Sequence, residues 1–519
     1  VGTPELFIGR GRGLRLGIVP KSSHEGVCMV WAVFRKELTE LLWTYRFLMA
    51  VGIFTLLLPV SFYGNAHDLR QRQAEYLEMT RLWLEQARTA EKMAEWKSLR
   101  NEAYRPPSPL SVWVLGLEAF IPNHIISTQE GLVRVEGQGG LHNPMATLMG
   151  SVDFAYVVGW VLSLLAFIFT FDAVAGEKER GTLRLLMANP VTRGQVLIGK
   201  GLASGVALGT ALMVGLLGAL LVLAGLYPDL LFRPTVLERV PWIFAVTWVF
   251  MFGMTFLGIL ASTLAHRAST VMVGLLLTWT FMALVIPRVS PMIAEALYPV
   301  ESPQVFHMKQ TLVRQALEKE WDRARRDLFE SVLERHGVWM RGYITSAPQT
   351  PEEKVALEAF EKARTALDRD YARRIQDRLD QMERDYQNRR LTQVRIAQWI
   401  ARVSPVSSLI HILTELAGTG LLELENVRVN ADRFHEQTRT AIYDKIIVHW
   451  FGSHFGTAVH VEYAPGFDPK MVTLPSLDYR LVPLRRVWQA IWVDIALLIL
   501  FAAGAFLGAL VRYLRYDIR

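Results

Sequence analysis

Residues 171–200 read FDAVAGEKERGTLRLLMANPVTRGQVLIGK, a charged, amphipathic stretch between two apolar runs. The runs, 151–171 and 202–226, each have about the 17 to 25 residues that a helix needs to cross roughly 30 Å of hydrocarbon. The sequence therefore predicts a short loop between two membrane spans, and the remaining chain is organised around that loop.

The loop carries its own helix signals. The GEKERG turn that begins at Gly176 breaks the preceding helix, and Thr182 can cap a short helix that ends at Asn189-Pro190. A second helix begins near Thr192 and leads into the next span. A helix that lies flat at the membrane surface between two spans is a lever, because a partner that presses on it moves both spans.

The whole chain has the composition of a membrane protein. It has 519 residues, of which 51% are hydrophobic and 20% charged, and its mean hydropathy is +0.22. We predict an all-α polytopic fold with six transmembrane helices. The predicted spans are 47–63, 151–171, 202–226, 242–264, 271–286 and 487–511.

Charges in the short loops predict the orientation of the chain. The 172–200 loop is rich in Lys and Arg, and the tight turn after the fourth span holds His266 and Arg267. Both loops should be cytoplasmic by the positive-inside rule. With six spans, the N and C termini, including the tail 512–519, are then cytoplasmic. Anionic lipid beside these loops accounts for the net charge of +7 without nucleic acid.

Two large segments are then extracytoplasmic and mainly helical. The first, 64–150, opens with a helix-favouring stretch from about 68 to 103, and residues 126–144 are predicted to be an irregular loop. The second, 288–486, contains two amphipathic helices joined around 337–351, which predicts an antiparallel hairpin. An apolar helix, 402–420, should return to the membrane surface, and another helix should cover 421–450.

The N-terminal region divides near Met29. Residues 1–28 lack periodicity, and we expect a disordered tail or a stretch upstream of the functional start. Residues 29–46 alternate apolar and charged side chains at helical spacing before the first span, which predicts an interfacial helix. An ordinary juxtamembrane helix without a partner is the alternative.

The order EKERGTL, NPVTR and GK resembles the loop between the second and third spans of ABC type 2 permeases, the membrane subunits of exporters whose ATPase is a separate chain. The resemblance implies that this loop docks on the ATPase and that residues 29–46 form the elbow helix on the same side. A loop that is basic only because it is short and cytoplasmic is the alternative. The resemblance assigns coupling to Glu177, Arg180, Gly181, Thr182, Pro190, Arg193 and Lys200, and elbow contacts to Arg35, Lys36 and Glu37.

The resemblance also implies partners and a location. It is strongest for the subgroup with large extracytoplasmic insertions, similar to permeases of nitrous oxide reductase maturation and gliding motility. It implies a bacterial inner-membrane protein with two ABC ATPase subunits, a second copy or sister permease, and an extracytoplasmic protein partner. ATP and magnesium would bind the ATPase, and this chain would hold no cofactor. Residues 194–201, GQVLIGKG, nearly form a phosphate loop, but Gly201 stands where the magnesium-binding hydroxyl should be.

Asp494 is the ionisable residue of interest inside a predicted span. A carboxylate in lipid is costly and usually has a partner or faces water. It is therefore a candidate intramembrane polar site; hydration near the outer interface, or pairing with Arg485 or Arg486, is the alternative. Histidines 449, 454 and 460 lie close in sequence, but their spacing does not place them on one helical face, so we predict no metal site.

These patterns predict a permease subunit that couples ATP hydrolysis in a partner to transport or to extracytoplasmic conformational work. The alternative is a transporter-derived scaffold or mechanotransmitter whose outer hairpin binds a partner while nothing crosses. A membrane-embedded enzyme is disfavoured, because we find no paired nucleophile and base and no metal cluster in the sequence.

Overall fold

The computed structural model describes residues 23–89, 101–128, 134–136, 152–182, 191–336, 350–443, 446–453, 456–463 and 475–515. Helices dominate these residues, as predicted, and short strands occur in two places. The elements are α1 Ser23–Leu42, α2 Tyr45–Thr89, β1 Asn101–Tyr104, η1 Pro109–Val112, β2 His124–Ser127, β3 Arg134–Glu136, α5 Phe154–Tyr156, η2 Val157–Leu162, α6 Ser163–Thr170, α7 Ala175–Arg180, α9 Arg193–Leu226, η3 Pro228–Leu230, α10 Pro234–Leu264, α11 Ala268–Thr280, η4 Phe281–Val285, α12 Ile286–Leu297, α13 Pro303–His336, α15 Pro351–Ala401, α16 Pro405–Ala417, α17 Leu421–Ala441, β4 Ile446–Ser453, β5 Gly456–Tyr463 and α18 Leu484–Leu514.

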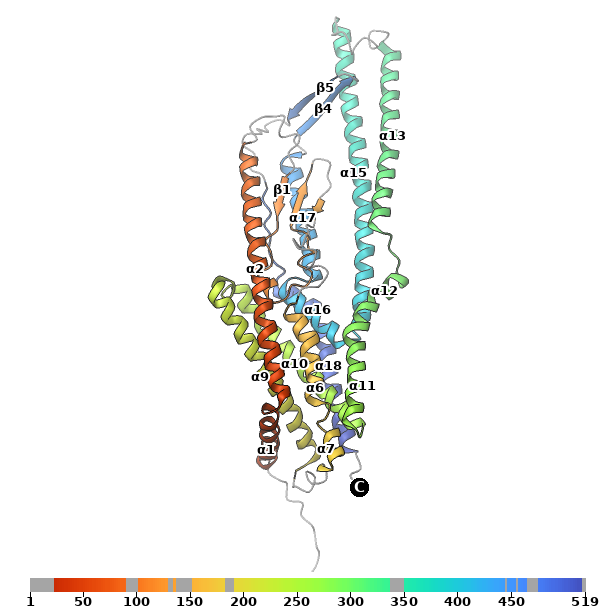
Figure 1. Ribbon diagram of the computed structural model, residues 1–519. Helices are drawn as coiled ribbons and strands as arrows, with labels where there is room; N and C mark the ends of the chain where they lie inside the picture. The colour runs from red at the N-terminus through yellow and green to blue at the C-terminus, as the bar shows by residue number, and fades with distance from the viewer. Residues whose placement is uncertain are drawn as a thin grey trace, which may run out of the picture.

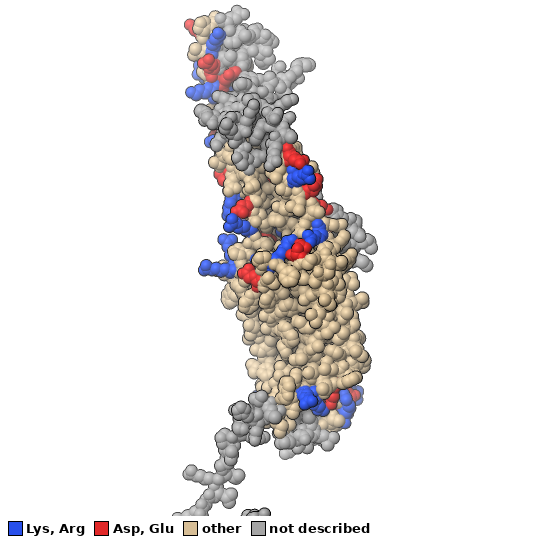
Figure 2. All heavy atoms as spheres, turned by 90° about the vertical axis from the view of Figure 1, so that its left-hand side faces the viewer, with Lys and Arg blue, Asp and Glu red and all other residues tan. Residues whose placement is uncertain are grey.

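The molecule is an elongated bundle with different structures at its two ends (Figure 1). Helices α1 and α7 and the C-terminal end of α18 lie at one end, which we call the base. The α13 and α15 hairpin projects at the other end. Figure 2 shows an uncharged band between acidic and basic residues at the base and those above it. Such a band is the surface expected of a membrane-spanning bundle.

Seven helical stretches among the described residues are long and apolar enough to cross a membrane, one more than the six predicted. Six of them coincide with the predicted spans. The seventh, Pro405–Ala441, consists of α16 and α17, which are separated at Gly418. Helix α16 has 13 residues and is therefore about 20 Å long, shorter than the roughly 30 Å hydrocarbon layer.

Two helices continue past their predicted boundaries. Helix α2 is continuous from Tyr45 to Thr89, so the first span and the start of the helix predicted over 68–103 are one element with Pro59 inside it. The end of that predicted helix is wrong, because residues 101–103 belong to strand β1. The fifth span, predicted to end at Ile286, continues through the π-helical segment η4 into α12. Pro287 lies just after η4 within this continuous helical stretch, where it has no N–H to donate to the preceding turn.

Glycines on α9 allow close helix packing. Cβ atoms at Gly201, Gly205 and Gly209 would lie within 2.6 Å of the α10 rings that pack on them, and one at Gly199 would lie 2.7 Å from Val33 in α1. The facing α10 rings are Phe256, Phe252 and Trp248. Gly199, which belongs to the phosphate-loop pattern in 194–201, and Gly201, which departs from it, are thus both helix contacts.

The region above the bundle contains strands that the sequence analysis missed. Strands β1, β2 and β3 form an antiparallel sheet, and residues 446–453 form β4, which pairs with β5. The predicted 421–450 helix is therefore wrong beyond Ala441, where α17 ends. Part of the predicted irregular loop, 126–144, is strand in β2 and β3, and the remainder lies mostly outside the described residues.

The hairpin of α13 and α15 confirms the predicted pair of long helices (Figure 1). At the end of the hairpin where α13 begins, Phe306 stacks on Tyr386 with ring centroids 4.0 Å apart. Further out, Asp368 Oδ1 accepts hydrogen bonds from Trp321 Nε1 and Arg325 Nε, each 2.8 Å long. Aromatic stacking and this shared carboxylate hold the two helices together.

Candidate coupling site and outer cluster

Helix α1 lies at the base and packs along α9 (Figure 1). It covers most of the predicted elbow, but it begins at Ser23 instead of Met29 and ends at Leu42. Residues 23–28, predicted to be tail, are thus helical, and residues from Tyr45 onward belong to α2. The elbow is a separate helix joined to the first candidate span by a two-residue break.

A buried ion-pair group, Glu37, Glu177 and Lys200, joins three helices at the base; we call it the basal cluster. Lys200 Nζ lies 2.8 Å from Glu37 Oε1 and 2.8 Å from Glu177 Oε1. The Lys200 side chain is 5% exposed, so its charge depends on these two carboxylates. The basal cluster ties α1 and α7 to one point on α9.

Helix α7 is fixed to the C-terminal end of α10. Ser262 Oγ accepts from the backbone N–H groups of Val174 and Ala175, each at 3.0 Å. Lys178 Nζ donates to Thr263 O at 2.7 Å, and a cation at a helix C-terminus is favourable. The helix ends at Gly181, whose φ of 72° is left-handed and suits glycine.

Two arginines connect the loop region to the first and last candidate spans. Arg46 in α2 forms a bidentate pair with Asp172, with both N–O distances 2.9 Å. Arg193 Nη1 donates to Leu514 O at 2.8 Å, at the C-terminal end of α18. A displacement of the loop is therefore passed directly to α2 and α18.

The predicted coupling residues divide into buried and exposed groups. Glu177, Arg193 and Lys200 are buried or half-buried and contact other helices of the same chain. Pro190, with the helix predicted after Thr182, lies outside the described residues. Of the predicted coupling and elbow residues, Arg180, Gly181, Thr182, Arg35 and Lys36 are exposed, and Glu37 is half-buried.

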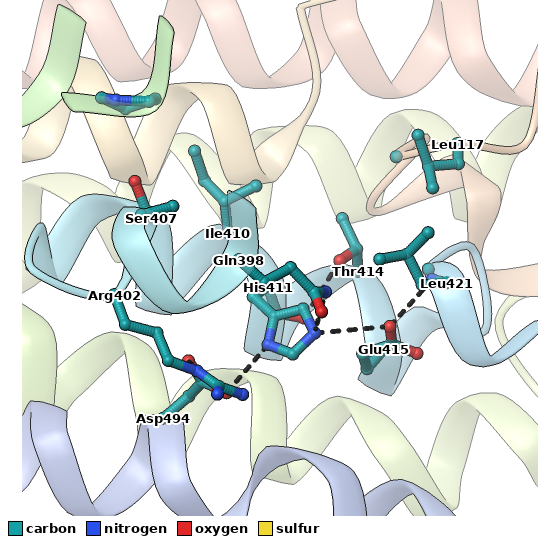
Figure 3. Close-up of a pocket in the computed structure, with 14 residues that line it drawn as sticks. Leu117, Gln398, Arg402, Ser407, Ile410, His411, Thr414, Glu415, Leu421 and Asp494 are labelled. Atoms are coloured by element: carbon teal, nitrogen blue, oxygen red, sulfur yellow. Dashed lines mark hydrogen bonds and ion pairs between the residues drawn. The ribbon is translucent and has the colours of Figure 1, made fainter. Parts of the chain in front are cut away.

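A second ionic group lies at the other end of the candidate spans, where α15, α16 and α18 meet (Figure 3). We call Arg402, His411 and Asp494 the outer cluster. Arg402 Nε and Nη2 donate to Asp494 Oδ1 and Oδ2, both at 2.9 Å, and His411 Nδ1 lies 2.9 Å from Asp494 Oδ2. Asp494 is fully buried. Arg402 and His411, and not the alternative partners Arg485 or Arg486, therefore pair with Asp494.

His411 makes polar contacts through both ring nitrogens. Its Nδ1 lies 2.9 Å from Asp494 Oδ2, so Nδ1 donates to this carboxylate. Its Nε2 lies 3.0 Å from Gln398 Nε2. Glu415, 3.6 Å from His411 Nε2, accepts from Leu421 N at 2.8 Å and so caps the start of α17.

A pocket of about 360 Å³ adjoins the outer cluster. Figure 3 shows the outer cluster on one side of it and Leu117 and Leu421 on the other. Helix α16 forms its floor and is anchored at Ser404, whose Oγ accepts from Ser407 N and donates to Met282 O in η4. A π-helical segment leaves such a carbonyl available to another helix.

Among the described residues, no group of three or more His, Cys, Asp or Glu side chains comes together. His449 and His460 are register partners in the β4–β5 hairpin, and His454 lies outside the described residues. His449 and His460 are therefore opposite each other because they belong to the two strands of one hairpin.

The sequence analysis missed Arg402, His411 and Glu415 as members of a site. One signal was present: these residues flank or interrupt an otherwise apolar helix that follows a Ser-Pro pair. We read the segment as an apolar helix, because apolar residues surround these three polar ones.

The fold and these sites define a polytopic helical membrane protein with separate ionic groups at the two ends of its span bundle. Residues 31–336 match the ABC-2 family transporter proteins, and residues 305–449 match a domain of unknown function, DUF3526. The chain belongs to the ABC-2 family.

Two curated relatives carry the description "Probable ABC transporter permease protein NosY". The relative from Pseudomonas aeruginosa is 37% identical over 93 residues, which are 18% of this chain and 33% of the relative. The relative from Stutzerimonas stutzeri is 37% identical over 79 residues, 15% of this chain and 28% of the relative. The matched segment therefore spans a third or less of either relative.

Proposed function

We propose that this chain is the permease subunit of an ABC exporter in a bacterial inner membrane. In this proposal six helices cross the bilayer, α16 re-enters from outside, and both termini and the base face the cytoplasm. Two ABC ATPase subunits, which bind the ATP and magnesium, dock at the base of a dimer of this chain or of this chain with a sister permease. Hydrolysis then drives transport or conformational work outside. Membership of the ABC-2 family and the similarity to NosY permeases support this proposal.

The observation that carries the proposal is the basal cluster. An ATPase that moves α1 or α7 acts on Lys200 through Glu37 or Glu177, so both contacts converge on α9. Buried charge pairs have discrete geometries, and breaking one is costly. The base therefore responds as a unit, and this is the behaviour a mechanical coupling device needs.

The exposed residues have a different role from the buried ones. Arg180, Gly181 and Thr182 at the end of α7, and Arg35 and Lys36 of α1, are the residues that we assign to docking, because they are exposed. Glu37, Glu177, Arg193 and Lys200 transmit the movement inside the chain.

A second candidate function is a transporter-derived scaffold or mechanotransmitter through which nothing is translocated. One observation favours it: the 51-residue helix α15 leads directly to Arg402, which pairs with Asp494 in α18. Movement of the last span would then reach an extracytoplasmic protein partner bound to the hairpin. ATP hydrolysis would drive both functions, so only a transport measurement separates them.

The first test is gentle purification from the native membrane, identification of co-purifying subunits by mass spectrometry, and measurement of ATP hydrolysis. We expect an ABC ATPase in a ratio near one to one. Arg180→Ala should lower the amount of ATPase retained, whereas Arg323→Ala, an exposed arginine in the hairpin, should not. Absence of any ATPase under several mild conditions would overturn the proposal.

A further inference from the structure

We propose that the pocket beside the outer cluster binds an uncharged, chain-bearing amphiphile taken from the bilayer, with diacylglycerol as the representative chemistry. The inference goes beyond the exporter proposal, because binding can be measured on the purified chain without an ATPase. It depends on the walls and the charges of the pocket and on the helices around it.

The walls suit an apolar chain. Leu117, Pro287, Ile410 and Leu421 line the pocket, and its volume of about 360 Å³ is within the range of small-molecule sites. The four residues come from different elements, so the cavity exists only in the folded bundle. An acyl chain can lie against these side chains and replace their contact with water.

The charges exclude a phosphate head. Arg402 and His411 both donate to Asp494, and Glu415 is satisfied by the N-terminus of α17. No charge in the lining is left uncompensated by these contacts. An anionic head would have to break the Arg402 to Asp494 pair and leave a buried carboxylate without its counter-ion.

The remaining polar groups suit a hydroxyl or carbonyl head. Ser407 lines the pocket, and its buried Oγ has no hydrogen-bond partner among the described residues. A buried hydroxyl without a partner is unfavourable, so a ligand that supplies one gains affinity. Thr414, whose hydroxyl donates to His411 O at 3.0 Å, can also accept a hydrogen bond from the ligand.

The helices around the pocket identify the bilayer as the source. Pro287, Ser407 and Asp494 of the lining belong to three different candidate spans. Beside Arg402 and Asp494 in the sequence, Trp399 is 59% exposed, Val403 73%, and Trp492, two residues before Asp494, 63%. Because the pocket lies among membrane-spanning helices with exposed apolar side chains nearby, a molecule can enter it from the lipid phase.

The test uses the purified chain in nanodiscs and a diacylglycerol that carries a photoactivatable diazirine in its acyl chain. We expect labelling of peptides that contain residues 398–421, and competition by unlabelled diacylglycerol but not by phosphatidylglycerol. Ile410→Trp should fill the pocket and abolish labelling, whereas Val355→Trp adds the same ring at a position of the hairpin that is 67% exposed and should not. Ser407→Ala should weaken binding about fivefold, the loss of one hydrogen bond.

Five outcomes would overturn the proposal. Four come from the labelling: no labelling of the wild-type chain, labelling outside the pocket, equal loss in the Ile410→Trp and Val355→Trp variants, or better competition by phosphatidylglycerol. The fifth is rapid disulfide formation between copies of a Val403→Cys variant, because a second copy would then cover the surface beside the pocket. If Ile410→Trp fails to fold, the position of the adducts in the wild-type chain still decides.

Discussion

Arg402 and Asp494, 92 residues apart in sequence, form a bidentate ion pair that joins the end of α15 to the N-terminal half of α18. The pair is buried, and His411 adds a third contact to the same carboxylate. The outer domain and the last candidate span are therefore one mechanical unit at this point.

Replacing Arg402 by Ala should destabilise the protein by about 3–5 kcal/mol, because the Asp494 carboxylate stays buried with only His411 beside it. Thermal or denaturant unfolding of the detergent-purified chain measures the loss. The double variant Arg402→Ala, Asp494→Asn should recover part of it. Arg480→Ala, which removes an exposed pair with Asp478, is the control and should change little. Equal effects of the two arginine variants would contradict the prediction.

Lys200→Met should leave two carboxylates, Glu37 and Glu177, facing each other in a buried site. We expect a loss of about 3–5 kcal/mol in the free energy of unfolding. In the assembled complex, we expect that ATP hydrolysis no longer responds to the addition of substrate. Adding Glu37→Gln and Glu177→Gln should restore stability without restoring coupling.

The control for that series is Lys36→Met, because Lys36 belongs to an exposed pair with Glu40 on the same helix. If Lys200→Met were no worse than Lys36→Met in the unfolding measurement, the basal cluster would not hold the three helices together.

Gly205→Leu should separate α9 from α10. A Cβ at this position would lie 2.4 Å from Phe252 Cε1, and overpacking of this kind costs about 1–3 kcal/mol. Gly225→Leu is a matched control on the same helix, since nothing lies within 4 Å of its added Cβ. Unfolding midpoints check both variants, and Phe252→Ala should partly rescue Gly205→Leu. If Phe252→Ala did not rescue Gly205→Leu, the loss of stability would not come from the contact between these two residues.

Asp368→Ala should loosen the hairpin without affecting the spans. It removes the shared acceptor of Trp321 and Arg325 and leaves the half-buried indole N–H without its partner, a local cost of about 1–3 kcal/mol. Hydrogen exchange should accelerate in α13 and α15 and stay unchanged in α9. Asp370→Ala, from an exposed pair with Arg374, should leave the exchange rates as they are.

The sequence predicted those features that depend on neighbours along the chain. Hydropathy located the bundle helices, and the hairpin helices followed from helical periodicity. The predicted GEKERG turn was wrong for residues 176–180, which lie in α7, and right only at Gly181, which ends that helix. The elbow was found as well, but its start at Ser23 was missed, since residues 23–28 lack an apolar stripe. These are local properties, and local rules suffice for them.

The partners of Asp494 could not be predicted, because they lie 83 and 92 residues away and depend on how α16 folds back across the bundle. The same holds for Glu37 and Lys200, which are 163 residues apart. The sequence analysis assigned Glu37 and Lys200 to contacts with the ATPase, whereas in the structure they contact each other within the chain. The β4–β5 hairpin was missed because its alternating residues follow directly on a helix whose pattern appeared to continue.

Length gives α15 a further property. A 51-residue helix is about 75 Å long, so a tilt of about 5° at its Arg402 end sweeps the far tip through roughly 6 Å. Sub-ångström adjustments in the span bundle thus become displacements larger than a hydrogen bond at the tip. A small change in the angle of α15 is therefore a large displacement of the tip of the hairpin, and a spectroscopic label at the tip would report it.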